Sequence, residues 1–445
     1  MLHYYFAVSV FLPCFLYANA LPGHRISIVS RHSLQGDPDA CTFNSTFLQA
    51  EHTLISGKYQ YASLFIQGIP IPDPDNYYTS NDTNSSNAPI LPNPISAIIK
   101  PVVANLTDFV DGVIDVLYYS SINIGTPFQT LTVDIDTGSA DLWFPAHCPS
   151  CIRDQFVPDE SSSYINKKRK FSVVYGSGSV KGVLATETVM LAGVTVQNQT
   201  FGAVSRTTDD FNYFPNDGLL GMAFGSIARC KQPTLFENMM AAGLVEARMF
   251  SVHLTRKREK GSEASGSLCL GCWDATKARE KPLYIAVKSE TYWTVFMDAV
   301  IVGQQRKSFA SLKLNAVIDT GTTLIYVSRL VAEQLYMMIP GSSPADDVGQ
   351  GMYKYPCDSE VNIALVFDGH KFPIDRRDFV LGKIDANSSY CVGGVLSHDG
   401  SGLDANLVIV GAVFIKSYYT TFDYGPRSGK ARIGFAKSIN QDIIN

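Results

Sequence analysis

The sequence predicts an all-β protein with two related lobes, and three observations lead to this prediction. Short apolar runs of strand-like composition dominate from Val116 onward, and Gly and Pro separate them. An Asp-Thr-Gly-Ser/Thr tetrapeptide occurs twice, starting at Asp136 and at Asp319, each time at the end of an apolar run. Helical signals are brief, at 233–242 and 328–338. A duplicated strand-and-turn in a strand-rich chain indicates two lobes with a cleft at their junction.

The composition is that of a folded protein with a sizeable core. The 445 residues are 46% hydrophobic and 11% aromatic, a length that suggests two or three domains. The net charge of −5 gives no electrostatic reason to expect nucleic acid or an anionic membrane as partner. The basic run 167–170 is interpreted as a solvated turn rather than a polyanion site.

The N-terminus has the pattern of a secretory signal peptide. Residues 1–20 have an apolar core and end in Ala18-Asn19-Ala20, a small-residue cleavage site. Pro13 interrupts this short run, which favours a cleaved signal over a membrane anchor. Six Asn-x-Ser/Thr triplets also fit a secreted glycoprotein, at Asn44, Asn81, Asn84, Asn105, Asn198 and Asn387. We expect secretion to the extracellular space, with the vacuolar lumen as the less favoured alternative.

We expect four parts along the chain. The signal peptide, 1–20, precedes a leader at 21–110 that is partly helical around 47–65 and then becomes rich in Pro, Asn and Ser, as linkers are. An N-terminal lobe at 111–255 and a C-terminal lobe at 256–445 follow. The alternative for the leader is a folded extension that stays attached.

The duplicated tetrapeptides suggest acid–base chemistry by paired carboxylates. In each copy an apolar strand delivers an Asp into a turn whose glycine, Gly138 or Gly321, permits close approach of the backbone. Two carboxylates within hydrogen-bond reach cannot both ionise cheaply, so the pair shares one proton over an acidic pH range. Such a pair can activate a water with one carboxylate and protonate a carbonyl oxygen with the other.

At these residues the chain resembles the pepsin-like aspartic peptidases, secreted fungal members in particular. The resemblance covers roughly 112–440 and includes 217–221 (DGLLG) and 408–411 (VIVG), which support the two Asp loops. It implies an acid endopeptidase of bilobal fold that acts on extended polypeptides, with Asp136 and Asp319 catalytic. It assigns Thr137 and Thr320 to locking the loops together, and Ser139 and Thr322 to bonding the outer carboxylate oxygens.

The family also has a flap that closes over the substrate, and 170–184 matches it as a β-hairpin. Tyr175 matches the flap tyrosine, Gly176 and Ser177 lie at the tip, and Trp143 matches the tryptophan that bonds the tyrosine. Without the resemblance, a surface hairpin and a core tryptophan would be the better interpretations.

Residues that set substrate preference are expected before Asp217 and on the strand of the first Asp. Phe211, Tyr213 and Phe214 lie where the family builds the wall of its primary pocket. Asp134 lies two residues before Asp136, and strand alternation puts both side chains on the same face. Asp134 is therefore a candidate for pairing a substrate Lys or Arg, with a solvated or internally bonded Asp as the alternative.

In the leader, Lys58-Tyr59 resembles the pair that plugs the cleft in zymogens of this family. An ammonium between two ionised carboxylates is a strong charge-assisted contact, and acid would release it. The resemblance thus implies that residues 21–110 contain a pro-segment.

The cysteines point to disulfides rather than to metal. Cys14 leaves with the signal, and an even eight remain, which is typical of a secreted protein. The family's bridges match Cys148–Cys151 and Cys357–Cys391, which leaves three pairings for Cys41, Cys230, Cys269 and Cys272. A fully extended chain would separate Cys269 and Cys272 by roughly 10 Å, too far for one bond. We therefore expect Cys230 to pair with one of these two. Zinc bound by the two Cys-x-x-Cys pairs is the rejected alternative.

No cofactor or metal is expected, because the histidines show neither metal-ligand nor triad spacing. We expect a monomer, with no membrane anchor and no partner beyond its polypeptide substrates. The alternative from another class is a catalytically inactive binding or inhibitor protein of the same fold. Loss of an Asp, of a motif glycine or of the flap tyrosine would favour it, and all are present.

Overall fold

The computed structural model describes 51–52, 55–67, 101–112, 114–175, 178–256, 266–426 and 429–440. Some residues with predictions lie outside these ranges, and those predictions are not tested by the structure. They are the signal peptide, Cys41, Asn44, Asn81, Asn84, Gly176 and Ser177. Within this part of the chain no helix is long and apolar enough to cross a membrane. The helices are short: α2 (Gln60–Ile66), α3 (Leu235–Ala241), α4 (Arg329–Tyr336), α5 (Arg376–Phe379) and α6 (Ala412–Ile415).

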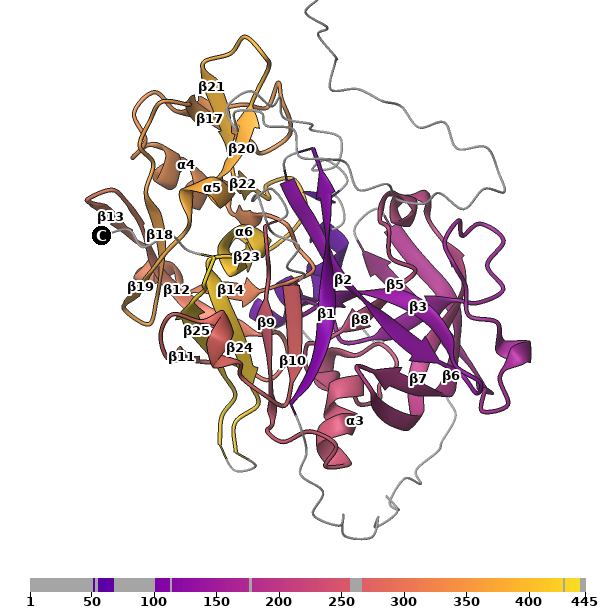
Figure 1. Cartoon of the computed structure of the whole chain (residues 1–445). Coiled ribbons are helices and arrows are strands. Elements are labelled where there is room, and N and C mark those ends of the chain that lie inside the picture. The colour runs from indigo at the N-terminus through magenta and orange to yellow at the C-terminus, as the bar shows by residue number, and fades with distance from the viewer. Residues whose placement is uncertain are drawn as a thin grey trace, which may run out of the picture. The chain divides into compact units, whose positions relative to one another are not determined.

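Strands dominate the described chain, as the sequence predicts (Figure 1). The largest sheet has the order β11-β25-β24-β9-β10-β1-β2-β3-β8-β4-β7-β6-β5 and joins the two halves of the chain. Its strands are β1 (Val102–Asp111), β2 (Ile114–Ile124), β3 (Gln129–Asp136), β4 (Leu142–Pro145), β5 (Ile165–Tyr175), β6 (Gly178–Leu191), β7 (Val194–Thr207), β8 (Gly218–Gly221), β9 (Met249–His253), β10 (Gly266–Leu270), β11 (Leu283–Ala286), β24 (Tyr418–Asp423) and β25 (Arg432–Lys437).

Two further sheets belong to the C-terminal half. The larger has the order β19-β18-β12-β14-β23-β15-β22, with β13 beside β12, and the smaller has the order β16-β17-β21-β20. Their strands are β12 (Thr294–Val302), β13 (Gln305–Ser308), β14 (Leu314–Ile318), β15 (Ile325–Val327), β16 (Ser343–Pro344), β17 (Tyr353–Pro356), β18 (Ile363–Phe367), β19 (His370–Pro373), β20 (Val380–Lys383), β21 (Tyr390–Gly393), β22 (Val395–Ser397) and β23 (Leu407–Val410).

The two halves repeat one local arrangement of three strands, as the duplicated motif predicts. In the first half β3 runs parallel to β8, and β4 pairs antiparallel with the same β8. In the second half β14 runs parallel to β23, and β15 pairs antiparallel with β23. In each half the strand before the Asp and the strand after the turn therefore flank one short apolar strand. The fold is the all-β, bilobal one expected.

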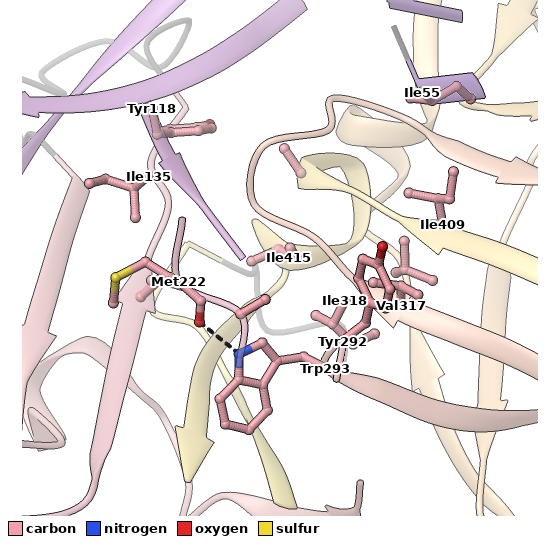
Figure 2. Close-up of a cluster of buried hydrophobic side chains, with 14 of the residues drawn as sticks. Ile55, Tyr118, Ile135, Met222, Tyr292, Trp293, Val317, Ile318, Ile409 and Ile415 are labelled. Carbon is pink, nitrogen blue, oxygen red and sulfur yellow. Dashed lines mark hydrogen bonds between the residues drawn. The ribbon is translucent and has the colours of Figure 1, made fainter. Parts of the chain in front are cut away.

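An apolar core runs from one half into the other. Trp293 is fully buried, and its indole nitrogen donates to the carbonyl of Met222, which follows β8, at 3.0 Å. Figure 2 shows Trp293 and Ile318 of the C-terminal half in one cluster with Met222 and Ile135 of the N-terminal half. Fully burying side chains of this size contributes about 1.5–3 kcal/mol each, so the core holds the two motif strands in fixed relation.

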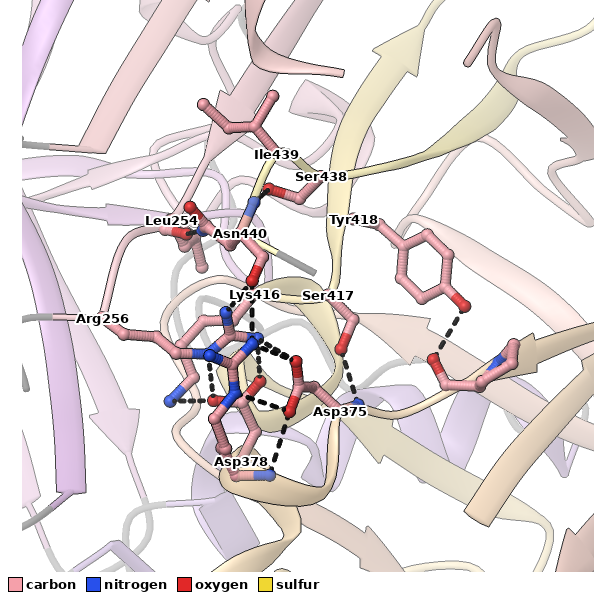
Figure 3. A network of polar contacts seen from close by, with 12 residues as sticks. Leu254, Arg256, Asp375, Asp378, Lys416, Ser417, Tyr418, Ser438, Ile439 and Asn440 are labelled. Atoms are coloured by element: carbon pink, nitrogen blue, oxygen red, sulfur yellow. Dashed lines mark hydrogen bonds and ion pairs between the residues drawn. The ribbon is translucent and has the colours of Figure 1, made fainter. Parts of the chain in front are cut away.

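A buried ionic network ties β2 to α5 and α6, and Figure 3 shows its part around Arg256, Asp378 and Lys416. Arg256 donates to both oxygens of Asp378, and Lys416 lies 2.7 Å from Asp115 and 3.0 Å from Asp378. Burial alone would raise the pKa of Asp378, but Lys416 and Arg256 hold it at about 2. Because each buried charge has an opposite partner, removing one would leave an uncompensated charge and destabilise the fold.

The first strand begins inside the range assigned to the leader. β1 starts at Val102 and pairs with β10 and β2 through residues before position 111. The helix expected around 47–65 corresponds to helical turns over 55–58 and to α2, which begins at Gln60. The boundary between leader and N-terminal lobe remains a prediction.

One cysteine prediction is wrong. Cys269 is bonded to Cys272, with their Cα atoms 5.4 Å apart, and Cys230 is a buried free thiol. The 10 Å estimate assumed an extended chain, but β10 ends at Leu270 and Gly271 has a φ of 73°. This left-handed turn, which glycine adopts readily, brings the two cysteines together. Cys148–Cys151 and Cys357–Cys391 are bonded, which are the pairs that the resemblance implies.

Candidate active site

The two motif loops place Asp136 and Asp319 side by side in the interior. Asp136 is the last residue of β3 and Asp319 follows β14, and both are fully buried. A Cβ on Gly138 would lie 2.6 Å from Asp319 Cγ, and one on Gly321 would lie 2.5 Å from Asp136 Oδ1. Each loop thus needs glycine because the other loop's carboxylate occupies that space.

A reciprocal pair of hydrogen bonds joins the loops. The Thr137 amide donates to Thr320 Oγ1 at 3.1 Å, and the Thr320 amide donates to Thr137 Oγ1 at 2.9 Å. The Thr137 hydroxyl donates onward to the Ile318 carbonyl at 2.9 Å, and the Thr320 hydroxyl to the Ile135 carbonyl. All these groups are buried, so breaking one bond would leave unpaired donors and acceptors.

Each carboxylate receives two further hydrogen bonds from its own loop. The Gly138 amide donates to Asp136 Oδ1 at 2.8 Å, and the Ser139 hydroxyl to Oδ2 at 2.6 Å. In the second loop the Gly321 amide donates to Asp319 Oδ1 at 3.0 Å, and the Thr322 hydroxyl donates to Oδ2. The carboxylates are therefore fixed in orientation before any substrate binds.

The leader inserts two side chains between the carboxylates. Lys58 Nζ lies 2.7 Å from Asp136 Oδ1 and 2.8 Å from Asp319 Oδ2. The Tyr59 hydroxyl donates to Asp319 Oδ2 at 2.6 Å, and its ring is fully buried. A Cβ on Gly138 would meet this hydroxyl at 2.4 Å. The described chain thus has its paired carboxylates covered by its own leader.

The two carboxylates differ in proton affinity. Burial raises the pKa of Asp136 to about 6, although the Lys58 ammonium opposes the rise. Burial also disfavours the ionised form of Asp319, but Lys58 and hydrogen bonds from Asp136, Lys58 and Thr322 hold its pKa below the ordinary value. The pKa of Lys58 is raised: burial opposes this, and the two carboxylates outweigh burial. The pair is therefore tuned to separate its two protonation steps.

Beside the pair, the β5–β6 hairpin carries the tyrosine that the resemblance singled out. Trp143 Nε1 donates to the Tyr175 hydroxyl at 3.0 Å. Phe211 packs edge-on against both rings, at centroid distances of 5.4 Å from Trp143 and 5.6 Å from Tyr175. The hydrogen bond and the ring contacts hold the end of β5, next to the tip of the hairpin, beside Asp136 in one cavity.

Comparison with known proteins agrees with this geometry. A sequence model of the family described as eukaryotic aspartyl protease matches residues 117–438. The chain belongs to this family. It is 34% identical over 349 residues to "Major aspartyl peptidase 1" of Cryptococcus neoformans var. grubii, covering 75% of this chain and 71% of that protein. It is 32% identical over 342 residues to "Pepsin A" of Rhinolophus ferrumequinum, covering 75% and 85%. As an aspartyl protease, the protein is a hydrolase that acts on peptide bonds.

A cavity of this aspartyl protease borders Asp136 and the second motif loop at Gly321 and Thr322. Phe211, Phe214 and Leu219 give it an apolar wall, and Asp134 and Asp136 line it together, as strand alternation predicts. Tyr213 is 59% exposed and does not line the cavity, so its expected place in the pocket wall is wrong. Tyr213 is the last residue of the short helix 209–213, and its side chain is exposed to solvent there.

Asp134 is buried, and its Oδ1 has no hydrogen-bond partner among the described residues. Burial, followed by the nearby charge of Asp136, raises its pKa well above the ordinary value. An unpaired polar atom at a cavity wall is costly unless a bound group satisfies it. Asp134 is thus a third carboxyl facing the cavity, neutral over a wider pH range than an ordinary Asp.

Sequence reasoning missed two leader residues near the site. Glu51 accepts hydrogen bonds from the Thr323 amide and, at 2.7 Å, from the Tyr326 hydroxyl. His52 Nε2 lies 3.2 Å from the Ser397 carbonyl, and its ring packs on Tyr326. Helical periodicity could have found Glu51, because Glu51, Ile55, Lys58, Tyr59 and Ala62 fall on one helix face.

Two further predictions concern glycosylation sites and metal binding. Asn105, Asn198 and Asn387 are exposed, as an acceptor for a glycan must be. Among the described residues no three His, Cys, Asp or Glu side chains are grouped so that they could hold a metal ion.

Proposed function

We propose that the protein is the zymogen of a secreted acid endopeptidase that works through Asp136 and Asp319. The observation that carries this proposal is that both buried carboxylates share one ammonium, at 2.7 and 2.8 Å. With the leader gone, two carboxylates this close share one proton. The ionised carboxylate accepts a proton from a water molecule, and the protonated one donates to the scissile carbonyl oxygen. The water oxygen adds to the carbonyl carbon and gives a tetrahedral gem-diol, with no acyl-enzyme.

The contacts of the leader are evidence that the precursor is latent. Lys58 and Tyr59 fill the position where a scissile peptide would meet the carboxylates, so the cleft is blocked while the leader is docked. Acid protonates carboxylates and weakens this anchor, and we propose that self-cleavage follows. No dibasic pair precedes Asp136 to serve a convertase.

Substrates are proposed to be polypeptides bound in extended form, with apolar residues next to the scissile bond. The aromatic wall of Phe211 and Phe214 supports this preference, because burying an aromatic or Leu side chain there contributes about 1.5–3 kcal/mol. The Trp143–Tyr175 bond supports a flap role for the hairpin, whose closure would exclude water.

Secretion is proposed from the signal pattern at 1–20, with the exposed triplets and disulfides as support. Three disulfides lie within the described residues, and disulfides persist in oxidising compartments. We propose an extracellular monomer, and the vacuolar lumen would satisfy the same chemistry.

The test is hydrolysis of denatured haemoglobin by the purified full chain across acidic and neutral pH. We expect activity only after acidification, inhibition by the transition-state mimic pepstatin, and no effect of EDTA. A neutral optimum or loss of activity in EDTA would overturn the mechanism. Lack of hydrolysis at every pH after leader removal would favour the inactive binding protein.

A further inference from the structure

Basic side chains from three neighbouring strands gather on the exposed face of the flap hairpin and of the strand beside it. The run 167–170, expected in a solvated turn, lies in β5 and is exposed throughout. Exposed and buried residues alternate along the rest of β5, so Lys170 and Ser172 lie on the same exposed face. Lys181 of β6 is directly opposite Ser172, Arg206 of β7 is directly opposite Lys181, and both are exposed. We call the six residues the basic face: Lys167, Lys168, Arg169, Lys170, Lys181 and Arg206.

A bulge in β5 adds to the exposed charge. The pairing register with β6 shifts between Asn166 and Arg169, and Lys168 has a left-handed φ of 56°. The Lys168 amide donates to Asn166 Oδ1 at 2.7 Å, which holds the bulge in place. Bulges change the direction of side chains, and here consecutive residues, Lys167 and Lys168, are both exposed.

The charges of the basic face have no counter-charge within the described part of the chain. No ion pair there joins any of the six residues to a carboxylate, Asp209 and Asp210 just after β7 included. Residues directly opposite each other on neighbouring strands have Cβ atoms about 4.5–5.5 Å apart, and like charges there are destabilising. Lys181 and Arg206 are such a pair. A bound anion would offset this repulsion.

Protection of the sheet edge explains only part of the basic face. β5 is the last strand in the order of the large sheet, and lysines on an edge strand discourage pairing with another molecule. Lys181 and Arg206, however, lie on the second and third strands from this edge, where such protection has no purpose. The charges on all three strands therefore indicate a surface for a partner that spans them.

The chemistry of this surface indicates which anions suit it. Carboxylates lose their charge near pH 4, whereas sulfate esters and singly ionised phosphate esters keep theirs, so the esters stay charged in the acid range of the proposed activity. The aromatic residues of β5, β6 and β7, which are Phe171, Tyr175 and Phe201, are all buried. The basic face therefore offers no stacking platform for the bases of single-stranded nucleic acid. Charge complementarity without stacking fits an anionic polysaccharide.

We propose that the basic face binds a polysaccharide that carries sulfate or phosphate esters. The ammonium groups pair with ester oxygens, and the Arg206 guanidinium can donate to two oxygens of one ester. Such binding would concentrate the secreted enzyme on an ester-bearing polymer. The preference for esters over carboxylates rests on the proposed acid activity, whereas the binding itself goes beyond that function and does not require it.

The experiment measures binding of the purified full-length precursor at pH 7, where the whole protein has a net charge of −5. Retention by an anionic polymer under these conditions requires a local basic surface. Dextran sulfate and dextran phosphate are the two probes, unmodified dextran is the control, and Kd is measured at several salt concentrations. We expect at least one ester polymer to bind, with log Kd rising linearly with the logarithm of the salt concentration. The tighter polymer identifies the ester.

The triple variant Lys170→Gln, Lys181→Gln, Arg206→Gln should lower the salt slope by about three and weaken binding at least about tenfold. The matched control removes the same net charge from exposed strand positions of the C-terminal half and should bind as the wild type does. Its three substitutions are Arg306→Gln, Lys307→Gln and Lys371→Gln. If the first triple variant does not fold, Arg206→Gln alone should lower the slope by about one.

Three results would overturn the proposal. The first is equal weakening by the two triple variants, because net charge would then govern binding. The second is that neither ester polymer binds at low salt. The third is tighter binding of a single-stranded oligonucleotide than of both polymers, which would assign the basic face to nucleic acid. All three are measured on the precursor without peptide hydrolysis, so they are distinct from failure of the proposed function.

Discussion

Thr137 and Thr320 bind each other reciprocally, each backbone amide donating to the other residue's hydroxyl, at 3.1 and 2.9 Å. The bonds join two loops from opposite halves of the chain directly under the paired carboxylates. The distance between the carboxylates is thus set by hydrogen bonds within the protein rather than by a ligand. Catalysis by two groups depends on such preset geometry.

Thr320→Val should impair the enzyme because it keeps the shape but removes the hydroxyl. The Thr137 amide and the Ile135 carbonyl would lose their partner in a buried site. We expect the free energy of unfolding to fall by about 1–3 kcal/mol and kcat to fall more than KM changes. Urea unfolding and peptide kinetics measure the two effects. Thr320→Ser keeps the hydroxyl and serves as control, and a Val variant with wild-type kcat would disprove the locking role.

Lys58→Ala should weaken latency, because two buried carboxylates would lose the ammonium that they share. We expect leader cleavage at a higher pH than in the wild type, or poor secretion of the precursor. Gel analysis of purified precursor over a pH series measures this. Lys168→Ala removes an exposed ammonium and should behave as the wild type. A Lys58→Ala precursor as latent as the wild type would remove Lys58 from the inhibitory role.

His52 should set the pH at which the leader starts to leave. Burial lowers its pKa in the docked leader, with a smaller contribution from His398. A lowered pKa means that the docked state favours neutral histidine, so docking is strongest at neutral pH. Docking then weakens as pH falls below about 6.5, by up to tenfold per pH unit, until the docked pKa is reached.

The other groups near His52 act differently over this pH range. Glu51 has a raised pKa when docked, so acid strengthens its contact, and Asp319 has a lowered pKa, so its ion pair with Lys58 persists to lower pH. Tyr326 remains neutral because burial raises its pKa. Burial lowers the pKa of His398, although the nearby charges of Asp399 and Asp404 oppose this. His52 and His398 can therefore begin release in mild acid, together with Asp136, whose pKa of about 6 lets its ion pair with Lys58 weaken over the same range.

His52→Gln keeps a side-chain N–H for the Ser397 carbonyl but cannot take up a proton. We expect the midpoint of leader cleavage to move to lower pH. Exposed His370→Gln is the matched control and should leave the midpoint unchanged. An unchanged midpoint in His52→Gln would show that the carboxylates alone govern release.

Much of the site could be predicted because its residues lie in repeated local patterns. The two tetrapeptides, each behind an apolar strand, indicated the paired loops, and strand alternation placed Asp134 beside Asp136. These predictions depend only on local geometry, which a strand determines strongly.

The failures concern turns and contacts between distant segments. The strand-like sequence at 269–272 does not reveal the left-handed turn at Gly271, so the distance across an extended chain wrongly excludes the Cys269–Cys272 bond. The hydrogen-bond partners of Glu51 depend on where the leader docks. The sequence of the leader does not indicate which distant residues it contacts. Helical periodicity could indicate which face of the leader is buried. It could not identify the Thr323 amide and the Tyr326 hydroxyl as the groups that bind Glu51.

Asp134→Leu should change substrate preference on the amino side of the scissile bond. The unpaired Oδ1 at the cavity wall could pair a substrate ammonium, which would lower the raised pKa of Asp134 and favour its ionised form. We expect the Leu/Lys ratio of kcat/KM for matched peptides to rise in the variant. Asp134→Asn tests whether charge or only polarity matters. An unchanged Leu/Lys ratio would leave Asp134 without a part in specificity.

The most direct test of the proposed mechanism is the acid activity of Asp136→Asn and Asp319→Asn. Both variants keep the size of the side chain, so circular dichroism should show a normal fold. The leader is removed from each by the same added protease, because an inactive enzyme cannot process itself. Asp159→Asn, which alters an exposed carboxylate, is the control. We predict that kcat on a haemoglobin peptide falls at least about 10³-fold in each dyad variant and not in the control. A folded, processed Asp136→Asn or Asp319→Asn enzyme with near wild-type kcat would contradict the shared-proton mechanism.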